Sequence, residues 1–335
     1  MKIKILFMII IIALALMLAG CGEEVTVNTK DPYVGGDNGL IIQFQEGNPP
    51  DMIFDGDTMD FVIAFLMENK GEHDIFEEDN DYDFGRLTLR GVNPEHYGLT
   101  QDELTIDFDD YNGDIISIPG YRKNPSDGSE IQGGRASAQF NTMKYQYDLQ
   151  GNNEVTFGVD LCYNYRTKST TNICIVSDIM DQEHKICDPQ GEKSPKNSGG
   201  PVRVSSVKQA FAGQNKLSLM IEISQANADG TIFKTIESAN ADDKVCDDSA
   251  TNINKNKVHV EVRLADGSED ESITCSEFGQ SNEGTITLYN GLPKMFVCNM
   301  DTADVNQDYE TPIFIDLEYA YGQYIETNVE IKDYQ

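Results

Sequence analysis

Hydrophobic residues recur with a period of two along much of the chain from Leu40 onward, which predicts β-strands rather than helices. In residues 59–67 the positions are apolar on both faces at mid-run, as in the central strand of a sandwich. Asn69-Lys70-Gly71 then supplies turn residues that end this strand. Further strands are expected at 86–89, 115–118, 138–147, 155–165 and 172–176. Because no stretch carries a sustained helical stripe, the pattern predicts an all-β fold of the sandwich type.

The chain contains an internal repeat. Residues 159–175 align without gaps on residues 315–331, and seven of the 17 positions are identical. Near the front of each copy, the strand and turn at 61–69 match those at 219–227. We interpret the repeat as a tandem duplication. The alternative is a chance likeness between two segments rich in Tyr, Ile and Thr, which are common in strands.

Each copy is predicted to end in a β-hairpin formed by its aligned segment, and the first hairpin would turn about Lys168. Alternate residues of each segment are expected to face the core, namely Val159, Leu161, Tyr163 and Tyr165 in the first copy and Ile315, Leu317, Tyr319 and Tyr321 in the second. We interpret these tyrosines as core and rim packing rather than as a platform for sugars.

The repeat and the composition together predict how the chain is divided. We expect a signal peptide at 1–20, a flexible Gly-rich tether at 21–40, a first β-sandwich at 41–178, a polar connector at 179–200 and a second β-sandwich at 201–335.

The N-terminus is typical of an export signal. Lys2 and Lys4 precede an uninterrupted apolar run at 5–18, which is short for a membrane-spanning helix. The following Leu18-Ala19-Gly20-Cys21 resembles the lipobox of prokaryotic lipoproteins, and this resemblance implies cleavage before Cys21 and its lipidation. The alternative is an uncleaved signal anchor with an incidental cysteine. Either reading places the remainder of the chain on the outer side of the cytoplasmic membrane, at the cell surface.

The cysteine count agrees with export. Apart from Cys21 there are six candidates for disulfide bonds, Cys162, Cys174, Cys187, Cys246, Cys275 and Cys298. If the first hairpin turns about Lys168, Cys162 lies opposite Cys174, and Cys187 is left to join the second sandwich. The competing choice is a local loop from Cys174 to Cys187. Six cysteines allow 15 pairings, and the sequence does not choose among them.

The charge balance excludes one class of partner. The chain has 25 Lys and Arg against 57 Asp and Glu, a formal net charge of −32, and no basic stripe. Such a protein is repelled by phosphate backbones, so nucleic-acid binding is not expected.

Two acidic clusters are candidate calcium sites, because carboxylate oxygens are the ligands that Ca²⁺ prefers. The first contains Asp79, Asp81 and Asp83, and the second contains Asp107, Asp109, Asp110 and Asp114. Neither has the spacing of an EF-hand. The alternative reading, which we favour, is a solvated acidic loop with no cofactor.

Residues 196–202 resemble the nucleophile segment of trypsin-like serine proteases, with Ser198 in the place of the nucleophile. The family's aspartate is replaced by Asn197, and none of His73, His96 and His184 or the strand residue His259 has the family's sequence context. We therefore favour a linker followed by a strand, and no catalytic residue is predicted.

The fragment at 56–71, together with the two-copy layout, resembles the CARDB-like, immunoglobulin-type modules that are repeated on prokaryotic surface proteins. The ectodomain also looks like tandem immunoglobulin-like lipoproteins of archaea. The resemblance implies two tandem immunoglobulin-like β-sandwich domains that serve adhesion or assembly, without catalytic residues.

These observations predict a non-catalytic, surface-exposed lipoprotein acting as an adhesion, interaction or envelope-structural module, with an unidentified cell-envelope protein as its partner. A calcium-dependent extracellular binding protein is the alternative, and a secreted serine hydrolase is a third.

Overall fold

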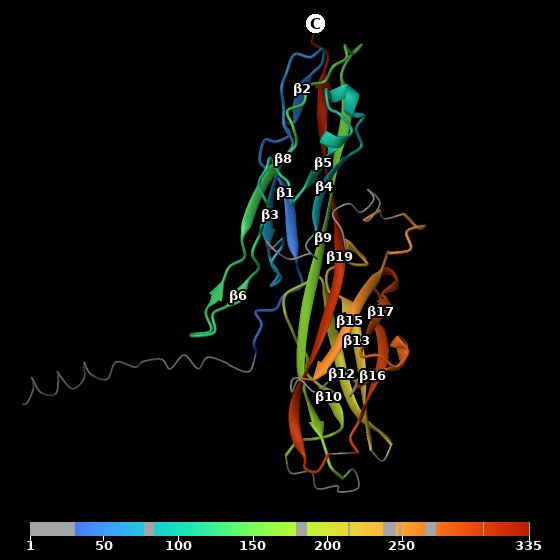
Figure 1. The fold of residues 1–335 in the computed structure, drawn as a ribbon. Helices are drawn as coiled ribbons and strands as arrows, with labels where there is room; N and C mark the ends of the chain where they lie inside the picture. Colours follow the sequence, from blue (N-terminus) through green and yellow to red (C-terminus); the bar gives the residue numbers. More distant parts are fainter. Residues whose placement is uncertain are drawn as a thin grey trace, which may run out of the picture.

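The structure is a computed structural model that describes residues 31–76, 84–178, 186–213, 215–236, 246–247, 249–264, 273–303 and 305–334. The predicted all-β fold is confirmed: the described residues form strands and four short 3₁₀ turns, and no α-helix occurs among them. The molecule is elongated, with two long strands running side by side through both halves (Figure 1).

The first half contributes β1 (Leu40–Phe44), β2 (Met52–Phe54), β3 (Ala64–Asn69), β4 (Gly85–Arg90), β5 (Thr105–Asp107), β6 (Arg122–Lys123), β7 (Glu130–Ile131), β8 (Arg135–Gln139) and β9 (Asn153–Ile175). The second half contributes β10 (Gly191–Lys193), β11 (Lys196–Asn197), β12 (Val202–Gly213), β13 (Lys216–Gln225), β14 (Gly230–Phe233), β15 (Lys257–Leu264), β16 (Ile273–Cys275), β17 (Glu283–Thr287), β18 (Lys294–Asp301) and β19 (Tyr309–Lys332). The 3₁₀ turns lie at Pro94–Tyr97, Asp102–Leu104, Ser276–Phe278 and Tyr289–Gly291.

β9 and β19 form the axis of the molecule. They are 23 and 24 residues long and pair antiparallel without a break from Asn153 opposite Ile331 to Ile175 opposite Tyr309. At ~3.3 Å per residue this ribbon is about 75 Å long. It is visible in Figure 1 as the green and red strands.

The predicted hairpins are therefore wrong, because each aligned segment is one straight strand. The polar stretch taken for a turn contains no Gly, Pro or Asn. Instead it continues the alternation, since Thr167 and Ser169 are fully buried and Lys168 is exposed. The expected strand at 115–118 is also absent, and the one expected at 138–147 ends at Gln139.

The two repeat segments meet at a pseudo-twofold axis normal to the sheet. Asn164 lies opposite Ala320, which is its own counterpart in the repeat alignment, and Tyr163 lies opposite Tyr321. The main path of the nine-stranded sheet has the order β17-β15-β19-β9-β4-β5. It is symmetric about the central pair, because β19, β15 and β17 on one side correspond to β9, β4 and β5 on the other. The repeats thus share one sheet.

Each half covers one arm of this sheet with a smaller sheet, β1-β3-β8 in the first half and β10-β12-β13-β18-β16 in the second. The side chains between the layers form one continuous core, to which β3 contributes Phe65 and Met67, and β13 contributes Leu219 and Ile221. Both halves are thus sandwich-like.

The tyrosines occupy equivalent positions in this core. The hydroxyl of Tyr163 accepts a hydrogen bond from the backbone N–H of Leu40 at 3.0 Å, and that of Tyr319 accepts one from the N–H of Val202 at 3.2 Å. The Tyr163, Tyr165, Tyr319 and Tyr321 side chains are all buried, as predicted. These two hydrogen bonds thus tie the long ribbon to the facing sheets, at the start of β1 in the first half and at the start of β12 in the second.

The six cysteines form three disulfides, Cys162–Cys246, Cys174–Cys187 and Cys275–Cys298. The alternative pair of Cys162 with Cys174 is wrong, because both cysteines lie on β9, about 40 Å apart along an extended strand. The local loop from Cys174 to Cys187 is the choice that holds. A covalent link between the halves does exist, but it uses Cys162 rather than Cys187.

Candidate functional site

The outward face of the nine-stranded sheet carries the polar residues of the ribbon. Arg166 on β9 lines two neighbouring cavities on this face, one of about 560 Å³ and one of about 460 Å³. Both have the volume of a small-ligand site. We call the larger one the acidic cavity and the smaller one the cationic cavity.

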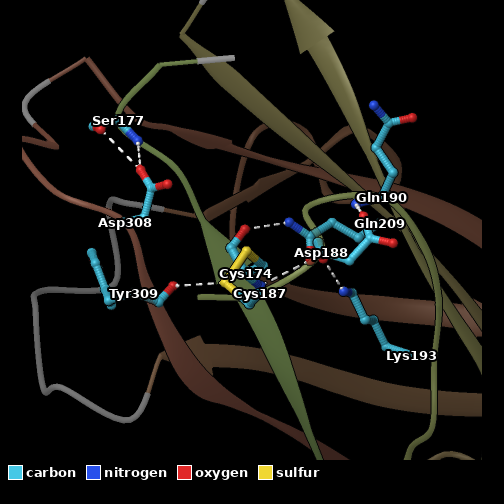
Figure 2. Close-up of a disulfide and its surroundings, with 9 residues drawn as sticks. All are labelled: Cys174, Ser177, Cys187, Asp188, Gln190, Lys193, Gln209, Asp308 and Tyr309. Carbon is cyan, nitrogen blue, oxygen red and sulfur yellow. Dashed lines mark hydrogen bonds between the residues drawn. A yellow bond between two sulfur atoms is a disulfide. The ribbon is translucent and has the colours of Figure 1, made fainter. Parts of the chain in front are cut away.

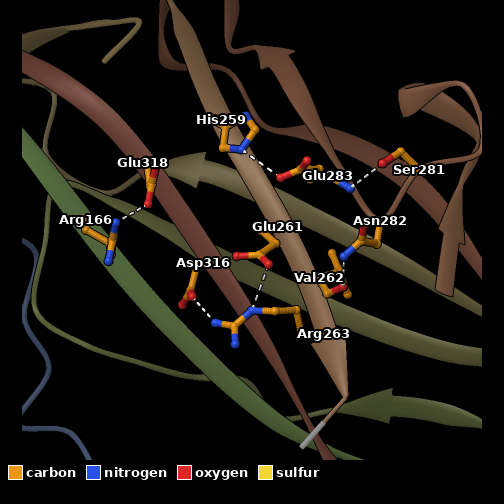
Figure 3. A network of polar contacts seen from close by, with 10 residues as sticks. All are labelled: Arg166, His259, Glu261, Val262, Arg263, Ser281, Asn282, Glu283, Asp316 and Glu318. Atoms are coloured by element: carbon orange, nitrogen blue, oxygen red, sulfur yellow. Dashed lines mark hydrogen bonds and ion pairs between the residues drawn. The ribbon is translucent and has the colours of Figure 1, made fainter. Parts of the chain in front are cut away.

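In and beside the acidic cavity, ion pairs connect three neighbouring strands (Figure 3). Arg166 on β9 pairs with Glu318 on β19, and Arg263 on β15 pairs with Asp316 and, at 3.1 Å, with Glu261. The carboxylate of Glu283 lies 3.6 Å from Nε2 of His259 in the same cavity.

An equivalent pair exists in the first half, where Nε of Arg90 lies 2.7 Å from Oδ2 of Asp160. Asp160 and Asp316 are identical positions of the repeat. Because one such pair occurs in each half, we interpret these contacts as cross-strand stabilisation of the sheet rather than as a reaction centre.

The cationic cavity is built mainly from the first half, with Ser198 contributed by the segment that follows β11. The short strand β6 brings Arg122 and Lys123, and β9 brings Arg166 and Lys168. The turn after β3 and neighbouring segments complete the lining with Glu72, His73, Asp74, Tyr33, Tyr121 and Ser198.

Glu72 holds these parts together. Its carboxylate accepts hydrogen bonds from the backbone N–H groups of Val34, Gly35 and Gly199 at 2.7–2.9 Å. Nζ of Lys123 donates to the carbonyl oxygens of Asp31 and Tyr33. The end of the segment expected to be a flexible tether is therefore bound to the body of the protein.

Two side chains of this cavity have strongly shifted pKa values. Burial, reinforced by the charge of Arg166, lowers the pKa of His73 to about 4, and the ring lies edge-on to Tyr165 with centroids 5.2 Å apart. His73 is thus neutral at pH 7. Burial and the carboxylates of Asp316 and Glu72 raise the pKa of Tyr33 to about 12.

Ser198 lies at the edge of the cationic cavity but is engaged by backbone. Its Oγ accepts a hydrogen bond from the N–H of Lys168 at 2.9 Å, and its own N–H donates to the Lys168 carbonyl at 2.8 Å. Within the described ranges, no hydrogen bond joins Ser198 to a histidine. His184 lies outside them.

The candidate calcium residues that the structure describes do not form a metal site. Asp79, Asp81 and Asp83 lie outside the described residues, and Asp107 is paired with Arg86 at 2.5 Å. The others, Asp109, Asp110 and Asp114, are exposed around a tight turn. Among the residues that the structure describes, no three His, Cys, Asp or Glu side chains converge on one point.

The Cys174–Cys187 disulfide fixes the chain that leads into the second half (Figure 2). The side-chain amide of Gln209 on β12 makes two hydrogen bonds to the backbone of Cys174. Its Oε1 accepts from the N–H of Cys174 at 3.0 Å, and its Nε2 donates to the carbonyl oxygen of Cys174 at 2.5 Å. The loop continues into β10 and β11, which pair with β12 and β9, so part of the expected connector at 179–200 is strand.

Cys21, the candidate for lipidation, lies outside the described residues. In the parts of the chain that are described, no helix has the length and apolarity needed to span a bilayer.

Sequence reasoning missed the cationic cavity. Its residues are scattered from Tyr33 to Ser198, and no short motif joins them. The available signal was the repeat itself, because Arg166 and Lys168 align with Gly322 and Tyr324, which carry no charge.

Fold and cavities together define an all-β, disulfide-bonded, sandwich-like protein. No family model matches the chain, and no curated protein does. Among solved structures, the major capsid protein P2 from bacteriophage PM2 has 9% sequence identity to it, and the comparison covers 83% of this chain and 97% of that one. The TM-score of 0.12 is too low to relate the two folds.

Proposed function

We propose that the chain is an exported, lipid-anchored and non-catalytic module of the cell surface, which serves adhesion or the structure of the envelope. The observation that carries this proposal is the paired ribbon of β9 and β19, which joins both halves into one stiff, elongated body. An elongated body without a motif for catalysis is suited to holding an interaction surface away from a membrane.

Two further features support the surface location. The apolar run ending at Cys21 has the pattern of a lipoprotein signal. Three disulfides are typical of proteins that fold in an oxidising, extracellular compartment. Membrane attachment through lipid on Cys21 follows from the first of these.

We further propose that each half is an immunoglobulin-like sandwich. The facing sheets β1-β3-β8 and β12-β13-β18 support this organisation, since each lies over one arm of the shared sheet. The two sandwiches would then share the ribbon of β9 and β19 rather than form separate domains joined by a linker.

The surface location is tested with a Cys21→Ala variant expressed beside the native chain in a bacterial host. We expect the native protein in the membrane fraction, labelled by a radioactive fatty acid and cleaved by protease added to intact cells. The variant should lose the label. Protection of the native protein from external protease would contradict the proposal.

The non-catalytic role is tested by saturable binding of the purified protein to isolated cell envelopes. Binding is expected to be unchanged by Ser198→Ala and by a chelator of divalent cations. Loss of binding with the chelator would favour the calcium-dependent alternative, and an activity lost in Ser198→Ala would favour the hydrolase.

A further inference from the structure

Because the two halves are related by the pseudo-twofold axis, the cationic cavity can be compared with the equivalent place in the second half. Arg166 and Lys168 correspond to Gly322 and Tyr324 in the second copy. There the equivalent place, which Gly322 and Tyr324 line, holds a cavity of only about 120 Å³. Because the second half forms the same sheet without these cations, the sheet itself does not require them.

Most charged groups of the cationic cavity are already satisfied. Arg122 is paired with Asp74, and Arg166 with Glu318. Lys123 and Lys168 also line the cavity, and Glu72 is the one carboxylate of its lining that has no ion pair among the described residues. The cavity therefore has a surplus of about one positive charge.

Two polar side chains in this cavity have unused hydrogen-bonding capacity. Among the described residues, Nζ of Lys168 has no acceptor and the imidazole of His73 has no hydrogen-bond partner. A neutral imidazole offers one donor and one acceptor, which matches a hydroxyl group, and an ammonium group matches a carboxylate.

We propose that the cationic cavity binds an acidic monosaccharide unit, whose single carboxylate contacts Lys168 and whose ring hydroxyls contact His73. The volume suits one sugar ring. Tyr33 and Tyr121 in the lining supply aromatic surface of the kind that packs on sugars. The inference does not depend on the lipid anchor, since every residue that it uses belongs to the folded body.

The overall charge makes the inference specific. A protein with a net charge of −32 repels anions at long range, so an anion binds only where local groups outweigh that field. Binding of an acidic sugar would therefore report on the cavity rather than on the general surface.

The test is titration of the full-length protein with D-glucuronate, in a non-ionic detergent without sugar headgroups, followed by calorimetry and thermal unfolding. We expect binding of D-glucuronate and a rise in Tm, with no effect of D-glucose, acetate or inorganic phosphate. Lys168→Gln should weaken binding about ten- to hundredfold, the effect of removing one charge-assisted hydrogen bond. His73→Phe keeps the ring beside Tyr165 and should also weaken binding.

Lys208→Gln is the matched control, because Lys208 is exposed on β12 and does not line the cavity. Its affinity should equal that of the native protein. No binding of D-glucuronate, equal losses in Lys168→Gln and Lys208→Gln, or binding of phosphate in preference to the sugar would each overturn the proposal. Since envelope binding and lipidation are measured separately, failure here is distinguishable from failure of the surface role.

Discussion

Tyr163 and Tyr319 perform the same task in the two halves. Each is fully buried, and each accepts a hydrogen bond from the N–H of the residue that begins a strand of the facing sheet, Leu40 of β1 and Val202 of β12. Burial also raises the pKa of both phenols well above the usual value, so they remain protonated. At the residue scale, the two copies thus share equivalent contacts as well as identical amino acids.

Replacing either tyrosine by phenylalanine should therefore cost a similar amount. Tyr163→Phe and Tyr319→Phe each leave a buried N–H unpaired, and we expect the free energy of unfolding to fall by about 1–3 kcal/mol in each case. Denaturant titration of each variant and of the native protein measures this change in the free energy of unfolding. Tyr324→Phe, at an exposed position, is the control and should stay within about 0.5 kcal/mol of the native value. A negligible loss in only one of the two buried variants would contradict the equivalence.

His73 gives the protein a pH-dependent stability. Its pKa is about 4 in the fold, where Arg166, Asp74 and Lys168 also act on it, and about 6.5 in an unfolded chain. Between these values the unfolded chain binds a proton that the folded protein does not, so stability falls as the pH drops from about 6.5 to about 4. His73→Phe should remove this part of the slope. Unfolding midpoints measured across that range check it, and an unchanged slope would contradict it.

β9 shows what a sequence does and does not specify about an element. Alternation at 155–165 and 172–176 correctly predicted strands and the buried face, because a period of two reports directly which side chains face inward. It did not predict that the two strands are one. Thr167 and Ser169 read as polar turn residues, yet they are buried in a strand, where Oγ1 of Thr167 is hydrogen-bonded to the hydroxyl of Tyr319 on the partner strand β19 at 2.8 Å.

The candidate site was less predictable for a similar reason. Lys168 and His73 are far apart in the chain, and the packing of the turn after β3 against β9, where the backbone N–H of His73 donates to the hydroxyl of Tyr165, places them in one cavity. The acidic clusters, by contrast, are contiguous in sequence, but a run of carboxylates does not itself bring oxygens to a common point.

The disulfides belong to the scale of elements, because they differ in the length of chain that they close. Cys162–Cys246 closes 84 residues and Cys174–Cys187 closes 13. In the loop-entropy model these are worth about 4.5 and about 3 kcal/mol. The Cys162→Ala/Cys246→Ala protein should therefore be less stable than the Cys174→Ala/Cys187→Ala protein in urea titrations. The reverse order would show that packing around Cys174 dominates.

At the scale of the whole molecule, the shared sheet predicts one cooperative unit. Independent domains in tandem unfold in separate steps, whereas these halves share the ribbon and one continuous core. Differential scanning calorimetry should give a single transition whose calorimetric and van't Hoff enthalpies agree. Residues 201–335 expressed alone would expose the edge of β19 and should dimerise or aggregate. Two resolved transitions, or a stable monomeric fragment, would contradict this.

The long sequence separation between β9 and β19 also sets the order of assembly. β9 is complete at Ile175, but its partner begins only at Tyr309. A chain that is synthesised from its N-terminus therefore presents an unpaired 23-residue edge of β9 until residues 309–332 have been added. Contacts so distant in sequence form slowly. Synthesis that stops short of residue 309 thus leaves neither half with a finished sheet, so both halves can complete their folding only once residues 309–332 are present.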